Sequence, residues 1–200
     1  MDRLLPVMLL KGLILLPNQE VKIELSNNLS KEITKLAVKD FNRFVLVITP
    51  HNQVEESPDV NDLPDVGVIG KIKSRIELPN GNVRITLKGI ERVKILDFQN
   101  DKENDDVLEA TITNIELPKF DEVEEKAVIK KLNELIEEYV TNSNHISNSI
   151  LNTIKTIDTL SLLTDTISSF ILISFNKKLE YVEEINAMYR ARNLLKDIKV

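Results

Sequence analysis

The feature that most constrains this chain is a change of hydrophobic period at Pro118. Before Pro118, apolar residues alternate with polar ones or form short runs between turn residues, which is typical of β-strands. After Pro118 the chain contains neither proline nor glycine, and apolar residues recur at intervals of three and four, which is typical of amphipathic helices. We therefore expect two domains of different class, residues 1–117 and residues 118–200.

The first half predicts several short strands and one helix. Val21–Leu25 alternates apolar and charged residues, and Phe44–Ile48 is a continuous apolar run that suits a strand buried on both faces. Between them, Ser30 can cap a helix that ends near Phe41. Further strands are expected at residues 7–10, 66–72, 92–96 and 108–117. This arrangement favours a small closed or nearly closed β-barrel, because closure removes exposed sheet edges.

A β-hairpin between Ile76 and Leu87 is the clearest local signal. Two runs with strand character flank the sequence Pro-Asn-Gly-Asn. Asn80-Gly81 is a pair favoured in type I′ turns, in which both central residues have positive φ. We therefore predict a type I′ turn and a strand that ends at Leu87, with a separate strand after Gly89.

The second half predicts four amphipathic helices. Acidic residues from Asp121 to Glu125 suit the first turn of a helix, where the helix dipole favours negative charge. A third helix is expected to begin after Asp158 or Thr159, and a fourth to extend from Asn176 to Lys199. The first two helices are expected at about residues 123–139 and 150–157. Four such helices with short loops predict a helical bundle.

Composition and charge exclude several kinds of function. The net charge is −6 and no run of Lys or Arg is present, which argues against nucleic-acid binding. Cysteine is absent, so disulfides, thiolate catalysis and cysteine-based metal sites are excluded. The apolar stretch Leu4–Leu16 is interrupted by Pro6 and Lys11 and is too short to span a bilayer. We therefore expect no membrane partner and a cytoplasmic location.

No constellation of residues suited to catalysis is visible. His51 and His145 stand in polar segments without a second nitrogen ligand nearby. Gly70-Lys71 lacks the spacing of a phosphate-binding loop, and Ile72 stands where Ser or Thr would coordinate magnesium. No serine lies in a G-x-S-x-G elbow. We assign no catalytic, cofactor-binding or metal-binding residue.

Several segments of the first half occur in a recognisable order and at recognisable intervals. Leu5–Pro17 reads as a strand that ends at a proline, and Phe44–Ile48 precedes an acidic loop. Asp65–Ile72 contains Val-Gly, Leu78–Val83 contains Leu-Pro-Asn-Gly, and Gly89–Ile95 contains Gly-x-x-Arg-Val. Together they resemble the N-terminal substrate-binding domain of Lon-type ATP-dependent proteases. The resemblance covers residues 5–117 well and continues more weakly through the helical half.

Two residues depart from the pattern of that family. Gly12 stands where a polar residue is usual, and Leu16 replaces the common Phe before the proline. The resemblance nevertheless implies an α+β fold class, in which a PUA-like small β-barrel with one helix is followed by a helical bundle.

The resemblance also implies a function without catalysis. Such a region helps to recognise unfolded, damaged or degron-bearing protein substrates and helps to assemble the parent hexamer, with no cofactor of its own. The ATPase and Ser–Lys protease domains would follow residue 200, so this chain would neither hydrolyse ATP nor cut peptides. Its end in a helix without a natural cap, Leu194–Val200, is what a fragment would look like.

Two alternatives remain open. One is a stand-alone Lon-domain protein that binds a peptide or a small ligand without an attached protease. The other is an RNA-binding protein, because PUA-like barrels serve that role elsewhere, although the acidic balance and the lack of clustered aromatic residues argue against it.

Substrate-contact residues are unassigned apart from one candidate. The acidic loop at residues 51–65 is the segment best suited to mobility, and Leu63 within it is a candidate apolar contact. The plainer interpretation is a solvated acidic loop. The final helix, Asn176–Lys199, is a candidate surface for self-association.

Overall fold

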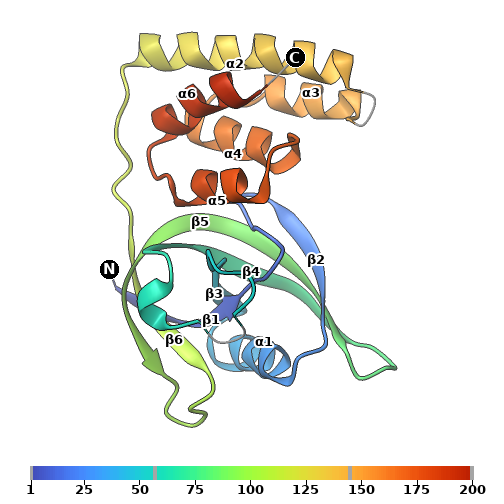
Figure 1. The fold of residues 1–200 in the computed structure, drawn as a ribbon, viewed down its shortest axis with the longest axis vertical. Coiled ribbons are helices and arrows are strands. Elements are labelled where there is room, and N and C mark those ends of the chain that lie inside the picture. The colour runs from blue at the N-terminus through green and yellow to red at the C-terminus, as the bar shows by residue number, and fades with distance from the viewer. Residues whose placement is uncertain (1, 56–57, 144–145, 199–200) are drawn as a thin grey trace. The chain divides into compact units, whose positions relative to one another are not determined.

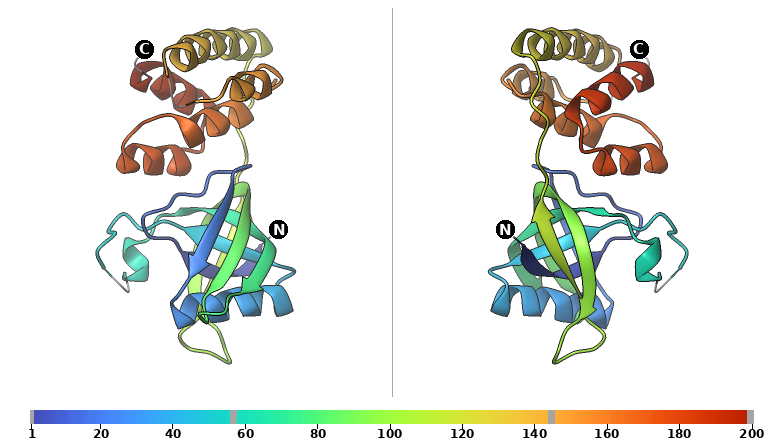
Figure 2. Two further views of the ribbon diagram at one scale, coloured as in Figure 1. Left: turned by 90° about the vertical axis from the view of Figure 1, so that its right-hand side faces the viewer. Right: turned by 90° about the vertical axis from the view of Figure 1, so that its left-hand side faces the viewer.

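The chain forms two compact units, Met1–Ile115 and Glu116–Val200. The computed structural model describes residues 2–55, 58–143 and 146–198 (Figures 1 and 2). Within these ranges, the first unit contains a six-stranded mixed sheet and one α-helix, and the second contains five α-helices. The predicted α+β class is therefore confirmed.

In the sheet of the first unit, the strand at one end of the order also pairs with a strand near the other end. Its strands are β1 (Arg3–Leu9), β2 (Glu20–Leu25), β3 (Phe44–Ile48), β4 (Val66–Glu77), β5 (Val83–Asn100) and β6 (Leu108–Asn114). Their order is β2-β5-β4-β3-β1-β6, and β6 also pairs with β5. The pairing of β1 with β3 is parallel, and every other pairing is antiparallel. Because β6 pairs with both β1 and β5, five of the six strands form a continuous circuit of hydrogen bonds.

One long strand, β5, replaces the two strands that the sequence predicts on either side of Gly89. A Cβ at Gly89 would lie 2.2 Å from the carbonyl oxygen of Leu16, so only glycine allows the chain near Leu16 to approach this closely. Asn18 donates a backbone hydrogen bond to Gly89, and Gly89 donates one to Gln19, with N···O distances of 2.9 and 2.8 Å. The prediction of a break was wrong because this glycine marks a close backbone approach.

The hairpin between β4 and β5 is confirmed, but its turn is not of type I′. The amide of Gly81 donates to the carbonyl of Leu78 at 2.9 Å, which places Pro79 and Asn80 at the centre of the turn. Gly81 has a φ of 82°, whereas Asn80 is not among the residues with positive φ. A turn followed by one glycine of positive φ is the three-residue hairpin loop. Pro79 explains the difference, because its ring fixes φ near −65° at the first central position.

Helix α1 (Asn28–Asp40) packs onto the sheet of the first unit. Its N-cap is Asn27 rather than the predicted Ser30, because the Asn27 side chain accepts a hydrogen bond from the Ser30 amide at 3.2 Å. Ile33, Thr34 and Ala37 form the buried face of the helix. One buried cluster of this unit joins strands β1, β3, β4, β5 and β6 with the loop before β4, and it consists of Leu5, Val7, Leu46, Ile48, Leu63, Ile69, Val93, Ile95, Ala110 and Ile112.

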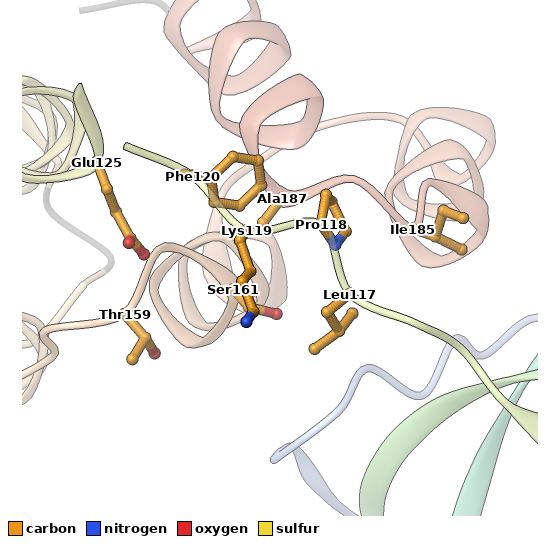
Figure 3. A pocket seen from close by; sticks show the side chains of 9 residues that line it. All are labelled: Leu117, Pro118, Lys119, Phe120, Glu125, Thr159, Ser161, Ile185 and Ala187. Carbon is orange, nitrogen blue, oxygen red and sulfur yellow. The ribbon is translucent and has the colours of Figure 1, made fainter. Parts of the chain in front are cut away.

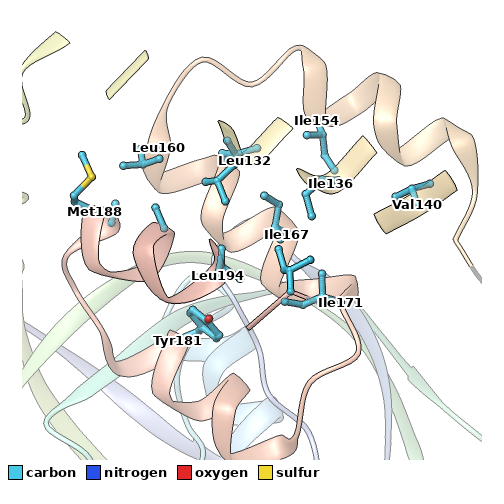
Figure 4. Packing of buried hydrophobic residues seen from close by; sticks show 14 residues of the cluster. Leu132, Ile136, Val140, Ile154, Leu160, Ile167, Ile171, Tyr181, Met188 and Leu194 are labelled. Carbon is cyan, nitrogen blue, oxygen red and sulfur yellow. The ribbon is translucent and has the colours of Figure 1, made fainter. Parts of the chain in front are cut away.

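The helices of the second unit share one apolar core (Figure 4). They are α2 (Glu122–Asn142), α3 (Asn148–Lys155), α4 (Leu160–Phe170), α5 (Phe175–Glu183) and α6 (Ala187–Asp197). Leu132, Ile136 and Val140 give α2 one buried face at intervals of four residues. Val123 belongs to the same predicted stripe, yet it is 76% exposed because it lies on the first turn, beyond the edge of the core. Ile154 of α3, Ile167 of α4, Tyr181 of α5 and Leu194 of α6 complete the packing.

The predicted final helix, Asn176–Lys199, is two helices. The chain leaves α5 after Glu183, and the Asn186 side chain caps α6 by accepting hydrogen bonds from the amides of Met188 and Tyr189. The prediction of one helix was wrong because neither proline nor glycine marks this corner. Lys199 itself lies outside the described residues.

A buried arginine stabilises the corner between α5 and α6. The Arg190 side chain is fully buried, and its guanidinium donates to the Glu184 carbonyl at 2.7 Å. It also donates to the hydroxyls of Thr164 at 3.1 Å and Ser161 at 3.0 Å, and its Nε lies 3.6 Å from an Asp165 carboxylate oxygen. Because buried charges need such partners, this network fixes α6 against α4 as well as closing the corner.

Candidate functional site

The first unit contains a groove with a volume of about 630 Å³. Residues from four separate parts of the chain line it: β1 with the segment that follows, the first turns of α1, the loop after β3, and the connection from β5 to β6. No single stretch of sequence forms this site. It exists because the circuit of strands brings these four segments together.

Apolar residues line the groove both at its buried base and nearer to solvent. Val7 and Ile33 line it and are 2% and 6% exposed, so they belong to the core as well. Leu29 and Val60 also line it, and each is 39% exposed. Leu29 precedes Ile33 by four residues on the same face of α1, so it extends the apolar face beyond the core. Exposed apolar surface that continues a core is characteristic of interaction sites.

Polar contacts connect the loop after β3 to the segment that follows β1. The Lys11 ammonium lines the groove and donates to the carbonyl of Glu55. Next to it, the Gly12 amide donates to the Gln53 side chain at 2.6 Å. The Thr49 hydroxyl donates to the Leu13 carbonyl at 3.1 Å. These bonds position one wall of the groove.

Leu63, the apolar contact suggested by the sequence, lies in the core. It is 8% exposed and packs in the buried cluster of the first unit. Within the same predicted loop, Val60 lies in a short 3₁₀ helix, η1 (Val60–Asp62), and faces the groove instead. Both residues are apolar and lie three positions apart in an irregular segment, so no periodicity could distinguish the one that is exposed.

One buried carboxylate belongs to a residue that follows a groove residue in the sequence but does not itself line the groove. Glu109 of β6 is 4% exposed, and burial raises the pKa of its carboxyl group. The hydrogen bond from the Gln99 side chain at 3.1 Å opposes this rise, and the nearby charge of Asp101 adds to it. Its neighbour Leu108 lines the groove, and successive side chains of a strand point to opposite faces.

The residues weighed for metal or phosphate chemistry do not come together. His51 is exposed, and His145 lies outside the described residues. Gly70 lies within β4, where a Cβ would meet Leu87 at 2.9 Å, so its absence of a side chain serves packing. Across the described ranges, no group of three or more His, Asp or Glu side chains is placed to hold a metal ion. In the same part of the chain, every helix is too short or too polar to cross a membrane.

A smaller hollow of about 340 Å³ lies within the second unit (Figure 3). Leu117 and Ile185, which are 62% and 38% exposed, line it. The Glu125 carboxylate also lines it, but it accepts a hydrogen bond from the Leu160 amide at 3.0 Å and so caps α4. The Ser161 hydroxyl is likewise engaged, by Arg190. The groove of the first unit is larger, so we take it as the candidate site.

Comparison with known families gives one match over nearly the whole chain. The family described as the ATP-dependent protease La (LON) substrate-binding domain matches residues 4–199. The Lon protease of Bacillus thuringiensis (strain Al Hakam) is 26% identical over 198 residues, which is 99% of this chain and 24% of that protein. The Lon protease of Halothermothrix orenii is 28% identical over 196 residues, 98% of this chain and 24% of that protein. The chain thus spans about a quarter of the length of these relatives.

Two solved structures share the fold. The N-terminal domain of the Mycobacterium avium complex Lon protease has a TM-score of 0.80 at 19% identity, with 97% of each chain covered. The Lon N-terminal domain protein from Xanthomonas campestris has a TM-score of 0.67 at 13% identity, with 98% of this chain and 99% of that chain covered.

Proposed function

Because this chain belongs to the ATP-dependent protease La (LON) substrate-binding domain family, we propose that it binds segments of protein substrates in the groove of the first unit. One observation carries the proposal: Leu29 and Val60 line the groove while each remains 39% exposed. Unfolded or damaged proteins expose the apolar side chains that folded proteins bury. An apolar surface that continues a core is complementary to such side chains.

The chain is a non-catalytic region of the kind found in Lon proteases, and the rest of its role follows as part of the proposal. It would recognise unfolded, damaged or degron-bearing substrates for an ATP-dependent protease whose ATPase and protease parts lie elsewhere. The cytoplasm is the location included in this proposal. The proposal includes neither a nucleic acid nor a membrane as a binding partner.

The proposal also includes the finer architecture. The return of β6 to β5 supports a PUA-like small β-barrel for residues 1–117, and the shared core of α2 to α6 supports a helical bundle for residues 118–200. The boundary at Pro118 lies close to the end of the first compact unit at Ile115.

Substrate binding is tested with fluorescently labelled casein, an unfolded model protein, by fluorescence anisotropy on the full chain. Replacing Leu29 with Gln should weaken binding about tenfold, because a buried leucine side chain contributes about 1.5 to 3 kcal/mol. Leu96→Gln is the matched control, since Leu96 is 48% exposed on β5 and does not line the groove. An equal loss in both variants, or no binding by the unchanged chain, would contradict the proposal.

Self-association in a parent hexamer is the second part of the proposal, with α6 as the contact surface. Tyr189 of α6 is 53% exposed, and exposed tyrosines are common at protein interfaces. The mass of the chain and of Tyr189→Glu in solution would be measured by light scattering over a range of concentrations. The variant should associate less. An unchanged mass at every concentration would exclude α6 as this surface, without bearing on the groove.

A further inference from the structure

The loop between β4 and β5 contains Asn80-Gly81, the one Asn-Gly pair in the sequence. In such a pair the asparagine side chain can react with the backbone amide that follows it, because glycine has no side chain to obstruct the approach. Every other asparagine of the sequence precedes a residue that has a side chain. Asn80 is exposed, and a Cβ built on Gly81 would meet no atom within 4 Å, so neighbouring atoms leave room for the reaction.

The reaction is deamidation, and water is its only other reactant. The amide nitrogen of Gly81 loses its proton to the solvent and bonds to Cγ of Asn80. The bond between Cγ and Nδ2 breaks, and Nδ2 takes up a proton and leaves as ammonia. Water then opens the resulting succinimide ring at either of its carbonyl carbons, which yields aspartate or isoaspartate. Either product carries a carboxylate where Asn80 had an amide.

The closed loop restrains both reacting groups. The Gly81 amide, which supplies the nucleophile, donates to the Leu78 carbonyl at 2.9 Å. The Asn80 side-chain oxygen accepts a hydrogen bond from the Asn82 amide at 3.0 Å, which restricts rotation of that side chain. The hydrogen bond to Leu78 must break before the nitrogen can attack, so the reaction requires the loop to open.

Two side chains from other elements hold the loop closed. Glu24 of β2 accepts hydrogen bonds from the side-chain amides of Asn82 at 2.9 Å and Asn80 at 3.4 Å. Lys31 of α1 donates to the Gly81 carbonyl at 2.8 Å. These hydrogen bonds lie at the surface, where each contributes modestly, so the loop opens more readily than the core of the sheet.

We propose that Asn80 is a site of spontaneous deamidation, that the closed loop slows the reaction, and that the product weakens the contact between the loop and β2. The product carboxylate cannot donate a hydrogen bond to Glu24 as the Asn80 amide does. The hydrogen bond from Asn82 is the main cause of a lowered pKa at Glu24, so the Glu24 carboxylate is charged at neutral pH. Two carboxylates would then face each other and repel. The proposal does not depend on substrate binding in the groove.

The rate is measured on the full chain at neutral pH, by mass spectrometry of its peptides after increasing times of incubation with and without urea. Without urea, Asn80 should deamidate faster than every other asparagine. Urea should accelerate the reaction at Asn80 at least about tenfold, because the hydrogen bonds of the loop no longer restrain it. An unmodified Asn80 when the unfolded chain has largely reacted, or a faster reaction at another asparagine, would overturn the assignment of the site. Equal rates would overturn the protection by the loop.

A second measurement tests the restraint from β2. Glu24→Ala removes the acceptor for the Asn80 and Asn82 side chains and should accelerate deamidation about threefold without urea. Glu20→Ala is the matched control, because Glu20 is exposed on the same strand and pairs with Lys88, away from the loop. Equal rates in the Glu24→Ala and Glu20→Ala variants would exclude Glu24 as a restraint.

The effect of the product is tested with Asn80→Asp, which has the aspartate side chain that deamidation creates. Amide hydrogen exchange in β2 should be about twofold to threefold faster in this variant, because the repulsion acts between exposed groups. Combining Asn80→Asp with Glu24→Gln removes the repulsion and should restore slower exchange. Unchanged exchange in the single variant, or equally fast exchange in both, would show that the product does not act through Glu24.

Discussion

The two units of this chain are shaped by different kinds of constraint. All five glycines lie in the first unit, and at three of them a Cβ would come within 3 Å of a neighbouring atom. The second unit has neither glycine nor proline after Pro118, and its corner is made by side chains, with Asn186 and Arg190 as the main groups. The first unit thus depends on how closely backbones approach, and the second depends on which side chains are buried.

This difference bears on where function can reside. In the second unit, the polar groups around the hollow at Glu125 and Ser161 are used for helix capping and for the Arg190 network. In the first unit, backbone pairing and close backbone approaches hold the sheet together. Side chains that line the groove, such as Leu29, Val60 and Asp106, are therefore less needed for the fold. We therefore expect binding in the groove of the first unit rather than in the hollow of the second.

The largest expected effect concerns the second unit. Replacing Arg190 with Met leaves Asp165 buried without its guanidinium, which should lower the free energy of unfolding by about 3 to 5 kcal/mol. The chain has no tryptophan and its three tyrosines, at positions 139, 181 and 189, all lie in this unit. Tyrosine fluorescence during urea unfolding therefore reports this unit. The double variant with Asp165→Leu should recover part of the loss, and a loss below about 1 kcal/mol in the single variant would contradict side-chain control.

Gly89→Ala is the corresponding change in the first unit. Its Cβ would meet the Leu16 carbonyl oxygen at 2.2 Å, so we expect a loss of about 3 kcal/mol. Hydrogen exchange followed by mass spectrometry should show faster exchange in β4 and β5, with the helices of the second unit unchanged. Gly12→Ala is the control, since a Cβ there meets no atom within 4 Å and only the φ of 70° is unfavourable, at about 1 kcal/mol. Equal losses in the two variants would rule out close approach as the constraint at Gly89.

A smaller effect is expected at the corner between α5 and α6. Asn186→Ala removes the acceptor for the amides of Met188 and Tyr189 and should cost about 1 kcal/mol, again measured by tyrosine fluorescence in urea. Asn152→Ala, an exposed substitution within α3, should change stability little. If Asn186→Ala is also without effect, the corner depends on Arg190 alone.

The smallest effect is a pH dependence in the first unit. Burial raises the pKa of Glu109 above its ordinary value of 4.5, so the folded state holds this proton to higher pH than the unfolded state does. Stability from this group is therefore complete below 4.5 and is lost as the pH rises through the folded-state pKa. Glu109→Gln should be more stable than the unchanged chain at neutral pH, and the difference should shrink on acidification. Urea titrations at several pH values measure it, and a difference that grows towards low pH would reverse the assignment.

The sequence predicted the kind of each unit better than its details. Alternation in Val21–Leu25 and the run Phe44–Ile48 correctly indicated strands, because burial on one face or both leaves a direct pattern. The turn type was missed although Pro79 carried the information, since proline at the first central position excludes the positive φ that type I′ needs. The corner at Asn186 had a weaker signal, because asparagine is common both within polar helix faces and at helix caps.

The candidate site could not be predicted from the sequence. Lys11, Leu29, Val60 and Asp106 become neighbours of one groove only after the strands have paired. Leu63 was a reasonable choice from composition, but its orientation depends on how the loop returns to β4, which no local pattern records.

The circuit of strands has a further consequence if the chain binds unfolded proteins as proposed. Because β6 closes onto β5, β2 is the strand of the described sheet that pairs on one side only. Its exposed residues are Glu20, Lys22 and Glu24, and charged side chains on an edge discourage another strand from adding to the sheet. Under the proposed function, an unfolded substrate would contact side chains in the groove and would not find a free strand edge suited to β-sheet growth.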